Sequence, residues 1–237
     1  MPNQTTNWTK VDVIRYIASR KKFRRYFEIT SRTTGQRFHE ANAIGFDVCT
    51  RLVYNFEGNH PDDLAVEFSS KSEDISYVQQ YIVSKYKNFD IILVDGYHTY
   101  DCASRDLQFA KSILKPGGVI VVHDCLPTSI TEASPEFSEG SWCGVTYKAF
   151  LDFCFRHRTS SYLTVDTDYG CGVVFSPENI FVGYLNYLTS FGKFTYQMKW
   201  KRLKDDYESL FCLLRHNNGR ILNLMSVEQL QQINFDS

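Results

Sequence analysis

The 237-residue sequence predicts a doubly wound α/β domain, built on a mainly parallel sheet of seven strands that ends in an antiparallel hairpin. Two observations support this fold class. Segments of strand character alternate with segments of helical periodicity from about residue 11 to residue 175, as in successive βαβ units. Segment 89–95 contains the unbroken apolar run 91–94 and ends in an acid, and segment 119–122 is a second such run, which is typical of parallel strands buried on both faces.

The first half of the chain shows this alternation. Four segments have the composition of strands, at 25–30, 43–48, 64–68 and 89–95. Three helices are expected between or before them, at 11–20, in a short stretch after Thr33, and at 69–85. The helix at 11–20 is predicted from apolar residues at 11, 13, 14 and 17, which share one helix face.

The second half completes the sheet. Helical periodicity over 100–114 ends at Lys115-Pro116-Gly117-Gly118, which predicts a turn before the buried strand at 119–124. Residues 126–143 are rich in Pro, Ser, Thr, Glu and Gly and predict a long loop. A helix at 144–157 and paired strands at 162–168 and 171–176 follow. We expect residues 1–176 to form the α/β domain and residues 177–237 a mostly helical extension packed on it.

Composition excludes several classes of protein. The net charge of −1 leaves no broad basic surface for nucleic acid. The polar first residues lead us to expect no signal peptide, and no apolar run approaches the ~20 residues of a membrane span. Seven cysteines without a CxxC pair predict reduced thiols, several of them buried as small apolar side chains. We therefore expect a soluble, cytoplasmic protein, and the sequence leaves homo-oligomerisation open.

Titratable residues concentrate at two neighbouring strand ends. In open α/β sheets, ligands bind outside the carboxyl ends of the strands. The densest cluster expected there consists of Asp95, His98, His123 and Asp124. Asp95, His123 and Asp124 could bind a divalent metal ion, and His98 could act as a general base. Each of these side chains could instead cap a helix or fill a structural hydrogen-bonding niche.

The other predicted strand ends offer weaker candidates. Glu28 and Thr30 end the first strand, before the turn that reaches Gly35. Asp47 ends the second, where an acid can accept hydrogen bonds from a ribose, although a surface Asp is as common there. Ser69 and Ser70 follow the third strand.

Two motifs resemble a known family. The strand-four sequence Asp95-Gly-Tyr-His-Thr-Tyr100 and the strand-five sequence Gly117-Gly-Val-Ile-Val-Val-His-Asp124 resemble class I S-adenosylmethionine-dependent methyltransferases, in the small bacterial branch with "DGxHxY" and "GGxxxxHD". Trp142–Lys148 and Asp166–Val174 resemble the same branch further along the chain. The resemblance covers about residues 10–176 and implies a Rossmann-like methyltransferase fold.

The resemblance also implies roles for the candidate residues. Glu28, Thr30 and Gly35 would belong to the cofactor motif, Asp47 would bind the ribose, Ser69 and Ser70 would lie near the adenine, and Asp95 would face the methionine end. Relatives that methylate sugar hydroxyls bind a magnesium-like ion, so Asp95, His123 and Asp124 would hold Mg²⁺ or another divalent metal. His98 or His123 would remove the acceptor proton, with Asp95 as a third catalytic candidate.

Three functions follow as hypotheses. The first is an O-methyltransferase that acts on a small polar acceptor, a sugar or surface-glycan hydroxyl in glycan biosynthesis. The second is a noncatalytic or altered-ligand binding protein, because Thr30 stands where the family's first motif has a glycine that lets the backbone approach the cofactor. The third is metal-assisted hydrolysis at the same strand ends.

Overall fold

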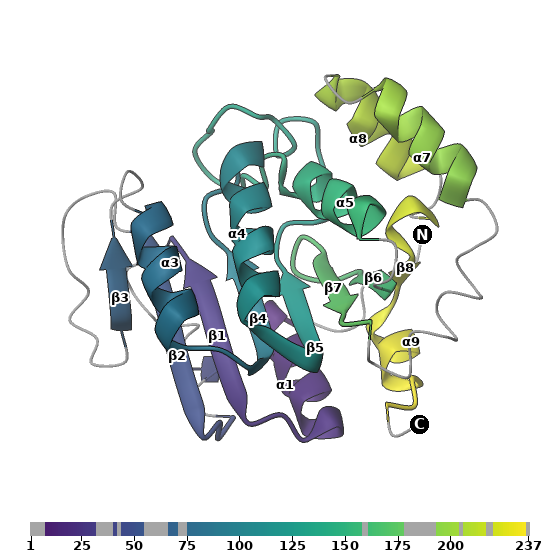
Figure 1. The fold of residues 1–237 in the computed structure, drawn as a ribbon. Coiled ribbons are helices and arrows are strands. Elements are labelled where there is room, and N and C mark those ends of the chain that lie inside the picture. Colours follow the sequence, from purple (N-terminus) through teal and green to yellow (C-terminus); the bar gives the residue numbers. More distant parts are fainter. Residues whose placement is uncertain are drawn as a thin grey trace.

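The protein is a layered α/β structure (Figure 1). The computed structural model describes residues 8–31, 40–41, 44–54, 66–70, 75–157, 161–177, 193–203, 206–216 and 220–235. Its strands are β1 (Arg25–Thr30), β2 (Val48–Tyr54), β3 (Val66–Ser70), β4 (Phe89–Asp95), β5 (Leu114–Val122), β6 (Ser161–Val165), β7 (Cys171–Phe175) and β8 (Leu224–Met225). Its helices are α1 (Lys10–Lys21), α3 (Ile75–Lys85), α4 (Tyr100–Ile113), α5 (Thr146–Arg156), α7 (Lys193–Arg202), α8 (Tyr207–His216), the short 3₁₀ helix η2 (Arg220–Leu222) and α9 (Val227–Gln231).

The sheet has the order β3-β2-β1-β4-β5-β7-β6-β8 among the described residues. Strands β1 to β5 pair in parallel, and β7 runs antiparallel to both β5 and β6. The predicted doubly wound fold with a closing hairpin is therefore confirmed. The sequence did not predict β8, a two-residue strand from the C-terminal segment that pairs in parallel with β6.

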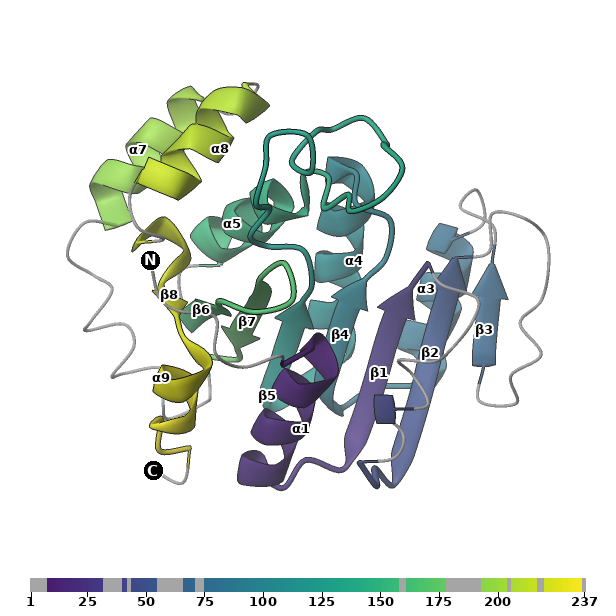
Figure 2. The same cartoon turned by 180° about the vertical axis from the view of Figure 1, so that it is seen from behind.

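Helices cover both faces of the sheet. Helices α3, α4 and α5 lie on the face seen in Figure 1, and α1 and α9 lie on the opposite face, seen in Figure 2. All seven residues of β4 are buried, and their side chains alternate between two cores. Ile92 and Val94 pack towards α4 and α5, whereas Ile91 and Leu93 pack towards α1. Each such side chain contributes about 1.5–3 kcal/mol by burial, which explains the unbroken apolar run.

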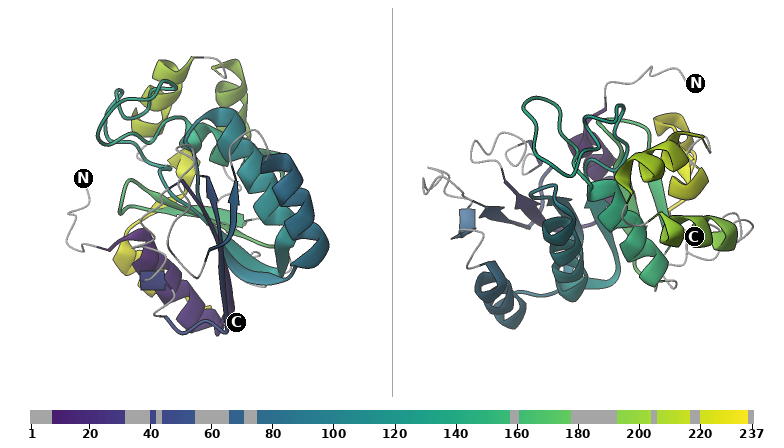
Figure 3. Two further views of the ribbon diagram at one scale, coloured as in Figure 1. Left: turned by 90° about the vertical axis from the view of Figure 1, so that its left-hand side faces the viewer. Right: turned by 90° about the horizontal axis from the view of Figure 1, so that it is seen from above.

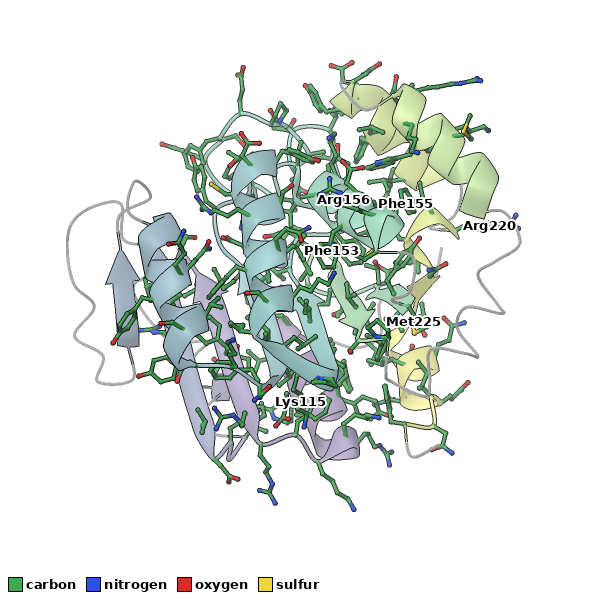
Figure 4. The ribbon with its side chains drawn as sticks, in the orientation of Figure 1. Lys115, Phe153, Phe155, Arg156, Arg220 and Met225 are labelled. Atoms are coloured by element: carbon green, nitrogen blue, oxygen red, sulfur yellow. The ribbon has the colours of Figure 1, made fainter. Side chains whose placement is uncertain are left out.

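The described C-terminal elements pack on this domain. Trp200 of α7 and Leu210 of α8 belong to the core on the α4–α5 side, and Val227 of α9 belongs to the core on the α1 side. Phe155 contacts Trp200 with ring centroids 6.2 Å apart, and Figure 4 shows Phe155 on the part of α5 nearest this segment. The division at residue 176 stays a prediction.

The position predicted for Asp47 is wrong. β2 begins at Val48, so Asp47 precedes this strand instead of ending it. The backbone N–H of Asp47 donates to the carbonyl of Arg24, just before β1, which places Asp47 at the amino edge of the sheet. Ile44 and Phe46, two of the apolar residues that suggested an earlier strand, lie in or beside a turn, where Phe46 stacks on Tyr26 with centroids 5.2 Å apart. Packing on the core, rather than strand pairing, explains their apolar character.

Two further element boundaries differ from the prediction. Ser69 and Ser70 are the last residues of β3, and α3 begins at Ile75. The expected turn at 115–118 forms the first part of β5, where Gly117 has φ +76° and the pairing with β4 shifts register. The helix expected after Thr33 and the candidate Gly35 lie outside the described residues.

Two observations concern membrane-spanning helices and the burial of the cysteines. None of the helices in the described part of the chain combines the length and the apolar composition that crossing a membrane requires. Cys125, Cys143, Cys154 and Cys171 are buried, as expected for small apolar side chains.

Candidate active site

The carboxyl ends of β1, β4 and β5 lie at the same edge of the sheet (Figure 2), and the right-hand view of Figure 3 looks down on this edge. The strand order reverses between β1 and β4, so the connections that follow these two strands diverge and leave a crevice. Thr30, the last residue of β1, is in register with Asp95, the last residue of β4. The backbone N–H of His123 donates to the carbonyl of Val94 at 3.0 Å, which extends the β4–β5 pairing to the site.

The four clustered candidates come together as expected. Nε2 of His98 lies 3.2 Å from Oδ2 of Asp124 and 3.9 Å from Oδ1 of Asp95. Nδ1 of His123 lies 3.1 Å from Oδ1 of Asp95 and 3.0 Å from Oδ2 of Asp124. Asp124 has φ +60°, a left-handed conformation that Asp tolerates better than most residues. This conformation places its carboxylate between the two imidazole rings.

The two histidines have different surroundings. His98 has a side chain that is 21% exposed, and its Nδ1 lies 2.7 Å from the carbonyl oxygen of Trp142. Because a carbonyl only accepts hydrogen bonds, Nδ1 of His98 carries a hydrogen, and Nε2 is the atom that can take up another proton. That proton would be stabilised by the Asp124 carboxylate.

His123 is enclosed on all sides by charged groups. Its side chain is 8% exposed, and Nε2 lies 3.3 Å from Oδ2 of Asp168. Burial lowers the pKa of His123, but Asp124 and Asp95 outweigh burial and the nearby Lys10, so the pKa is held well above its ordinary value. The carboxylates beside both ring nitrogens stabilise the protonated ring, which disfavours His123 as the group that accepts a proton from a substrate.

Lys10 and Asp168 are site residues that the sequence analysis missed. Nζ of Lys10 lies 2.6 Å from Oδ2 of Asp95, and the backbone N–H of Lys10 donates to Oδ2 of Asp168 at 2.8 Å. Lys10 begins α1, 85 positions before its partner Asp95, and no motif marks it. Asp168 lies in the turn of the β6–β7 hairpin, inside a motif that was assigned to the hairpin alone.

The contacts with Lys10 and His123 favour the ionised forms of Asp95 and Asp168. Burial raises the pKa of Asp95, but Lys10 and His123 more than compensate and hold it far below the usual range. Burial also opposes ionisation of Asp168, yet His123 and Lys10 lower its pKa to about 2. Burial lowers the pKa of Lys10, but the Asp95 carboxylate and the neighbouring acids raise it by more, so the pKa lies above its ordinary value. The cluster therefore contains ionised carboxylates held by protonated bases.

The described residues fit a divalent metal ion poorly in this arrangement. Asp95, His98 and Asp124 each offer one ligand atom, and these atoms lie within 4.8 Å of one another. However, the Lys10 ammonium bonds to Oδ2 of Asp95, and a protonated His123 lies between the two carboxylates. A metal ion would have to displace or neutralise these cations. Metal binding by Asp95, His123 and Asp124 stays a prediction.

A cavity of about 430 Å³ opens onto this cluster. Its charged and imidazole-bearing lining comprises Lys10, Asp95, His98, His123, Asp124 and Asp168. Its aromatic lining comprises Tyr97, Phe137, Trp142 and Tyr169. The ring of Trp142 makes edge contacts with Tyr97 and Phe137 at centroid distances of 5.3 and 5.2 Å. The lining of the cavity thus combines ionic and aromatic side chains.

The loop after β5 is tied to the cluster. The indole Nε1–H of Trp142 donates to the carbonyl of Ser134, and the Ser141 hydroxyl hydrogen-bonds to that of Tyr169. The backbone N–H of Val145 donates to the carbonyl of His98 at 3.0 Å. Gly144 has φ +56°, and a Cβ at this position would lie 2.2 Å from the carbonyl oxygen of His98. The predicted loop at 126–143 therefore forms a wall of the cavity and contacts the candidate base directly.

The predicted cofactor residues are only partly brought together. Thr30 and Asp95 are adjacent at the crevice, and Glu28 is buried two residues before Thr30 in the same strand. Asp47 lies at the opposite edge, with an exposed side chain 3.9 Å from that of Arg24, so it cannot bind a ribose at this site. The backbones of Ser69 and Ser70 end β3 at the carboxyl edge. Gly35 lies outside the described residues.

Comparison with known sequences finds one family. Residues 15–125 match the family model described as "Methyltransferase domain". This stretch includes β1 to β5 and both histidines of the site. No curated protein sequence matches the chain significantly.

Solved structures share the fold. The O-methyltransferase from Bacillus cereus, in complex with SAH, is 16% identical, with 73% of this chain and 82% of that chain covered and a TM-score of 0.51. A Klebsiella pneumoniae protein assigned as an O-methyltransferase is 12% identical, with 74% and 83% covered and a TM-score of 0.53. Cofactor-bound Rv0187 from MTB is 14% identical, with 76% and 84% covered and a TM-score of 0.51. At these identities the likeness is one of fold.

Proposed function

We propose that this protein transfers a methyl group from S-adenosylmethionine to a hydroxyl group, because residues 15–125 match a methyltransferase domain and the fold is shared with solved O-methyltransferases. We further propose a small polar acceptor, a sugar or surface-glycan hydroxyl. The observation that carries the proposal is the position of His98 in the cavity lining. Its Nδ1 is engaged by the Trp142 carbonyl and its Nε2 faces Asp124, which is the arrangement of a general base.

His98 would remove the proton of the acceptor. Bound S-adenosylmethionine would supply a methyl group on a cationic sulfur, which the acceptor oxygen takes by in-line displacement. Nε2 of His98 would take up the hydroxyl proton, and Asp124, 3.2 Å away, would stabilise the resulting imidazolium. The Trp142 carbonyl would keep the ring in the orientation that exposes Nε2. The sequence left His98 and His123 as alternatives, and the buried, multiply paired His123 supports the choice of His98.

The described part of the site is compatible with the cofactor's methionine end. Ser31 and Gly96, which follow the adjacent strands β1 and β4, both line the cavity. Gly96 lacks a side chain, so its backbone is accessible to a ligand there. Asp95 lies between this region and His98, and we propose that it orients the ligands through its contacts with Lys10 and His123.

The cavity lining supports an acceptor with a hydroxyl-bearing ring. Trp142 and Tyr97 provide flat apolar surfaces, and Ser141 provides a hydroxyl group on the same wall. Small-molecule sites combine apolar walls with a few polar groups that fix orientation. A sugar ring offers both an apolar face and hydroxyls for these groups.

The proposal is tested first by calorimetry with S-adenosylmethionine and then by product analysis. We expect micromolar binding of the cofactor. The loaded protein is then incubated with a panel of monosaccharides and nucleotide sugars, and SAH release and the methylated product are measured by mass spectrometry. Folded protein that shows no heat of binding at millimolar S-adenosylmethionine would overturn the proposal.

A second candidate function rests on Thr30. This β-branched residue ends β1 and is buried beside Asp95, at the point where the family's motif has glycine. The Thr30 side chain leaves less room for S-adenosylmethionine to approach the backbone at the end of β1. This favours a binding protein that has kept the methyltransferase fold but binds an altered ligand and transfers no methyl group. The same calorimetry separates the two functions, because this candidate predicts a folded protein that does not bind S-adenosylmethionine.

A further inference from the structure

A buried lysine contributes a positive charge to the site from outside the motifs. Lys10 is 3% exposed although it begins a helix, and α1 carries it to the sheet face seen in Figure 2. Its Nζ lies 2.6 Å from Oδ2 of Asp95 and 3.5 Å from Nδ1 of His123. Lysine is almost never fully buried unless it is paired. The Asp95 carboxylate is the partner that makes this burial acceptable.

The first turn of α1 fixes where the ammonium lies. The backbone N–H of Lys10 donates to Oδ2 of Asp168. Oδ2 of Asp12 accepts hydrogen bonds from both the backbone N–H and the hydroxyl of Thr9, which caps the amino end of α1. The Thr167 hydroxyl donates to the carbonyl of Trp8, so the hairpin turn is bonded to the same segment. Lys10 is therefore held at both its backbone and its side chain.

The position of Lys10 brings its positive charge close to several carboxylates. Asp95, Asp124 and Asp168 bring three carboxylates to one small region. Carboxylates gathered in this way usually hold a divalent ion, because unpaired buried charge is costly. Here the Lys10 ammonium provides positive charge within the protein itself, 2.6 Å from Oδ2 of Asp95. The ammonium bonds to one of the oxygens of Asp95 that would otherwise be offered to a metal.

We propose that Lys10 supplies the positive charge of this site in place of a divalent metal ion, as a positioning residue whose ammonium holds the Asp95 carboxylate in line with His123. This inference deepens the proposed function, since it assigns the cation of the same site. Its test needs neither S-adenosylmethionine nor an acceptor, so its outcome is independent of whether methyl transfer is found.

The test is Mn²⁺ binding, measured by the loss of the free-ion signal in electron paramagnetic resonance. Wild-type protein is expected to take up no Mn²⁺ through Asp95, so wild type and Asp95→Asn give the same titration. Lys10→Ala removes the ammonium and opens space beside the carboxylates, so it is expected to bind Mn²⁺ through Asp95, with a Kd at least about tenfold below that of any residual binding by wild type. The double variant Lys10→Ala with Asp95→Asn is expected to lose this gain.

Two further variants separate charge from structure. Lys10→Arg keeps the positive charge and is expected to exclude Mn²⁺ as wild type does. Lys115→Ala is the matched control, because Lys115 is ion-paired with the buried Asp90 at the other end of β4, away from the cluster. Removing Lys115 leaves one carboxylate without the neighbouring ligands of the site, so no Mn²⁺ uptake is expected.

Two results would overturn the inference. One is Mn²⁺ binding by wild type that disappears in Asp95→Asn, which would mean that a metal and Lys10 coexist. The other is a Lys10→Ala variant that is folded by circular dichroism and gains no Mn²⁺ binding. If Lys10→Ala does not fold, the comparison of wild type with Asp95→Asn still decides, because Asp95-dependent binding contradicts the inference and its absence supports it.

Discussion

The Tyr26 hydroxyl donates a 2.6 Å hydrogen bond to Oε2 of Glu28 within β1, and both side chains are buried. Burial raises the pKa of Glu28 to about 7, against the opposing effect of this hydrogen bond. The Asp95 carboxylate at the end of the neighbouring strand raises the pKa further, whereas Lys10 lowers it. Glu28 therefore keeps a proton in the folded protein at pH values where an exposed glutamate has lost it.

Glu28→Gln should change how stability depends on pH. In wild type the folded state retains a proton that the unfolded chain releases near pH 4.5, the ordinary pKa of a glutamate, so the free energy of unfolding falls as pH rises from about 4.5 to about 7. A difference of ~2.5 pKa units corresponds to roughly 3 kcal/mol. Glu28→Gln cannot ionise, so its stability relative to wild type should rise by up to that amount over this range. Urea denaturation of both proteins at a series of pH values measures the difference.

Glu208→Gln is the control for this experiment, since Glu208 is an exposed acid in the first turn of α8. Its pH profile should run parallel to that of wild type. A Glu28→Gln profile that is also parallel to wild type would show that Glu28 does not carry the proton.

His98→Asn should abolish most of the methyl transfer. An asparagine amide can still donate to the Trp142 carbonyl but cannot take up a proton, so kcat should fall by about 10²–10⁴-fold with the affinity for S-adenosylmethionine unchanged. Single-turnover rates and calorimetry measure the two quantities separately. His157→Asn, at the distant end of α5, should leave both unchanged. Retention of the wild-type rate by His98→Asn would exclude this residue as the base.

Gly144→Ala should damage the site more than an equivalent glycine substitution elsewhere in the same region. Gly144 and Gly140 both have positive φ, but a Cβ at 144 would meet the carbonyl of His98 at 2.2 Å, whereas nothing lies within 4 Å of a Cβ at 140. Gly140→Ala should therefore cost only the left-handed backbone penalty of about 1–2 kcal/mol. Gly144→Ala should lose more stability and also displace His98, with a lower kcat. Equal thermal melts and rates for the two variants would contradict this account.

Thr30→Gly should tighten the binding of S-adenosylmethionine. The substitution restores the residue that the family has at the end of the first strand and removes a buried side chain beside Asp95. Thr50→Gly, in the adjacent β2, is the control because it carries the same strand penalty of about 0.5–1 kcal/mol away from the crevice. Calorimetry should show a lower Kd for Thr30→Gly alone. An unchanged Kd would mean that Thr30 does not restrict the pocket.

The central strands could be predicted from the sequence because burial on both faces requires apolar residues at successive positions. β4 and the second half of β5 are buried, so these runs and the acids and histidine that follow them could be identified from composition, whereas the earlier start of β5 at Leu114 could not. The convergence of Asp95, His98, His123 and Asp124 then followed from the general position of ligands at carboxyl strand ends. That part of the site is local in sequence to the strands that carry it.

The errors and omissions have a physical origin as well. Asp47 was misplaced because Ile44 and Phe46 are apolar through packing against the core, which composition cannot distinguish from strand pairing. Lys10 was missed because its partner lies 85 positions further along the chain, and a lysine at a helix start is ordinarily exposed. The role of Trp142 was missed because its carbonyl, not its side chain, orients His98. Backbone contacts of this kind leave no mark on residue type.

The hydrogen bond between the Lys10 backbone and Asp168 joins positions 158 residues apart. A fragment that ended after β5 would contain the parallel strands and both histidines, but it would lack the hairpin that holds the start of α1 in place. The ligand-binding edge is therefore complete only when the start of α1 and the turn of the hairpin are present together. Fragments produced by cleavage within the 126–143 loop should regain function only when both halves are mixed.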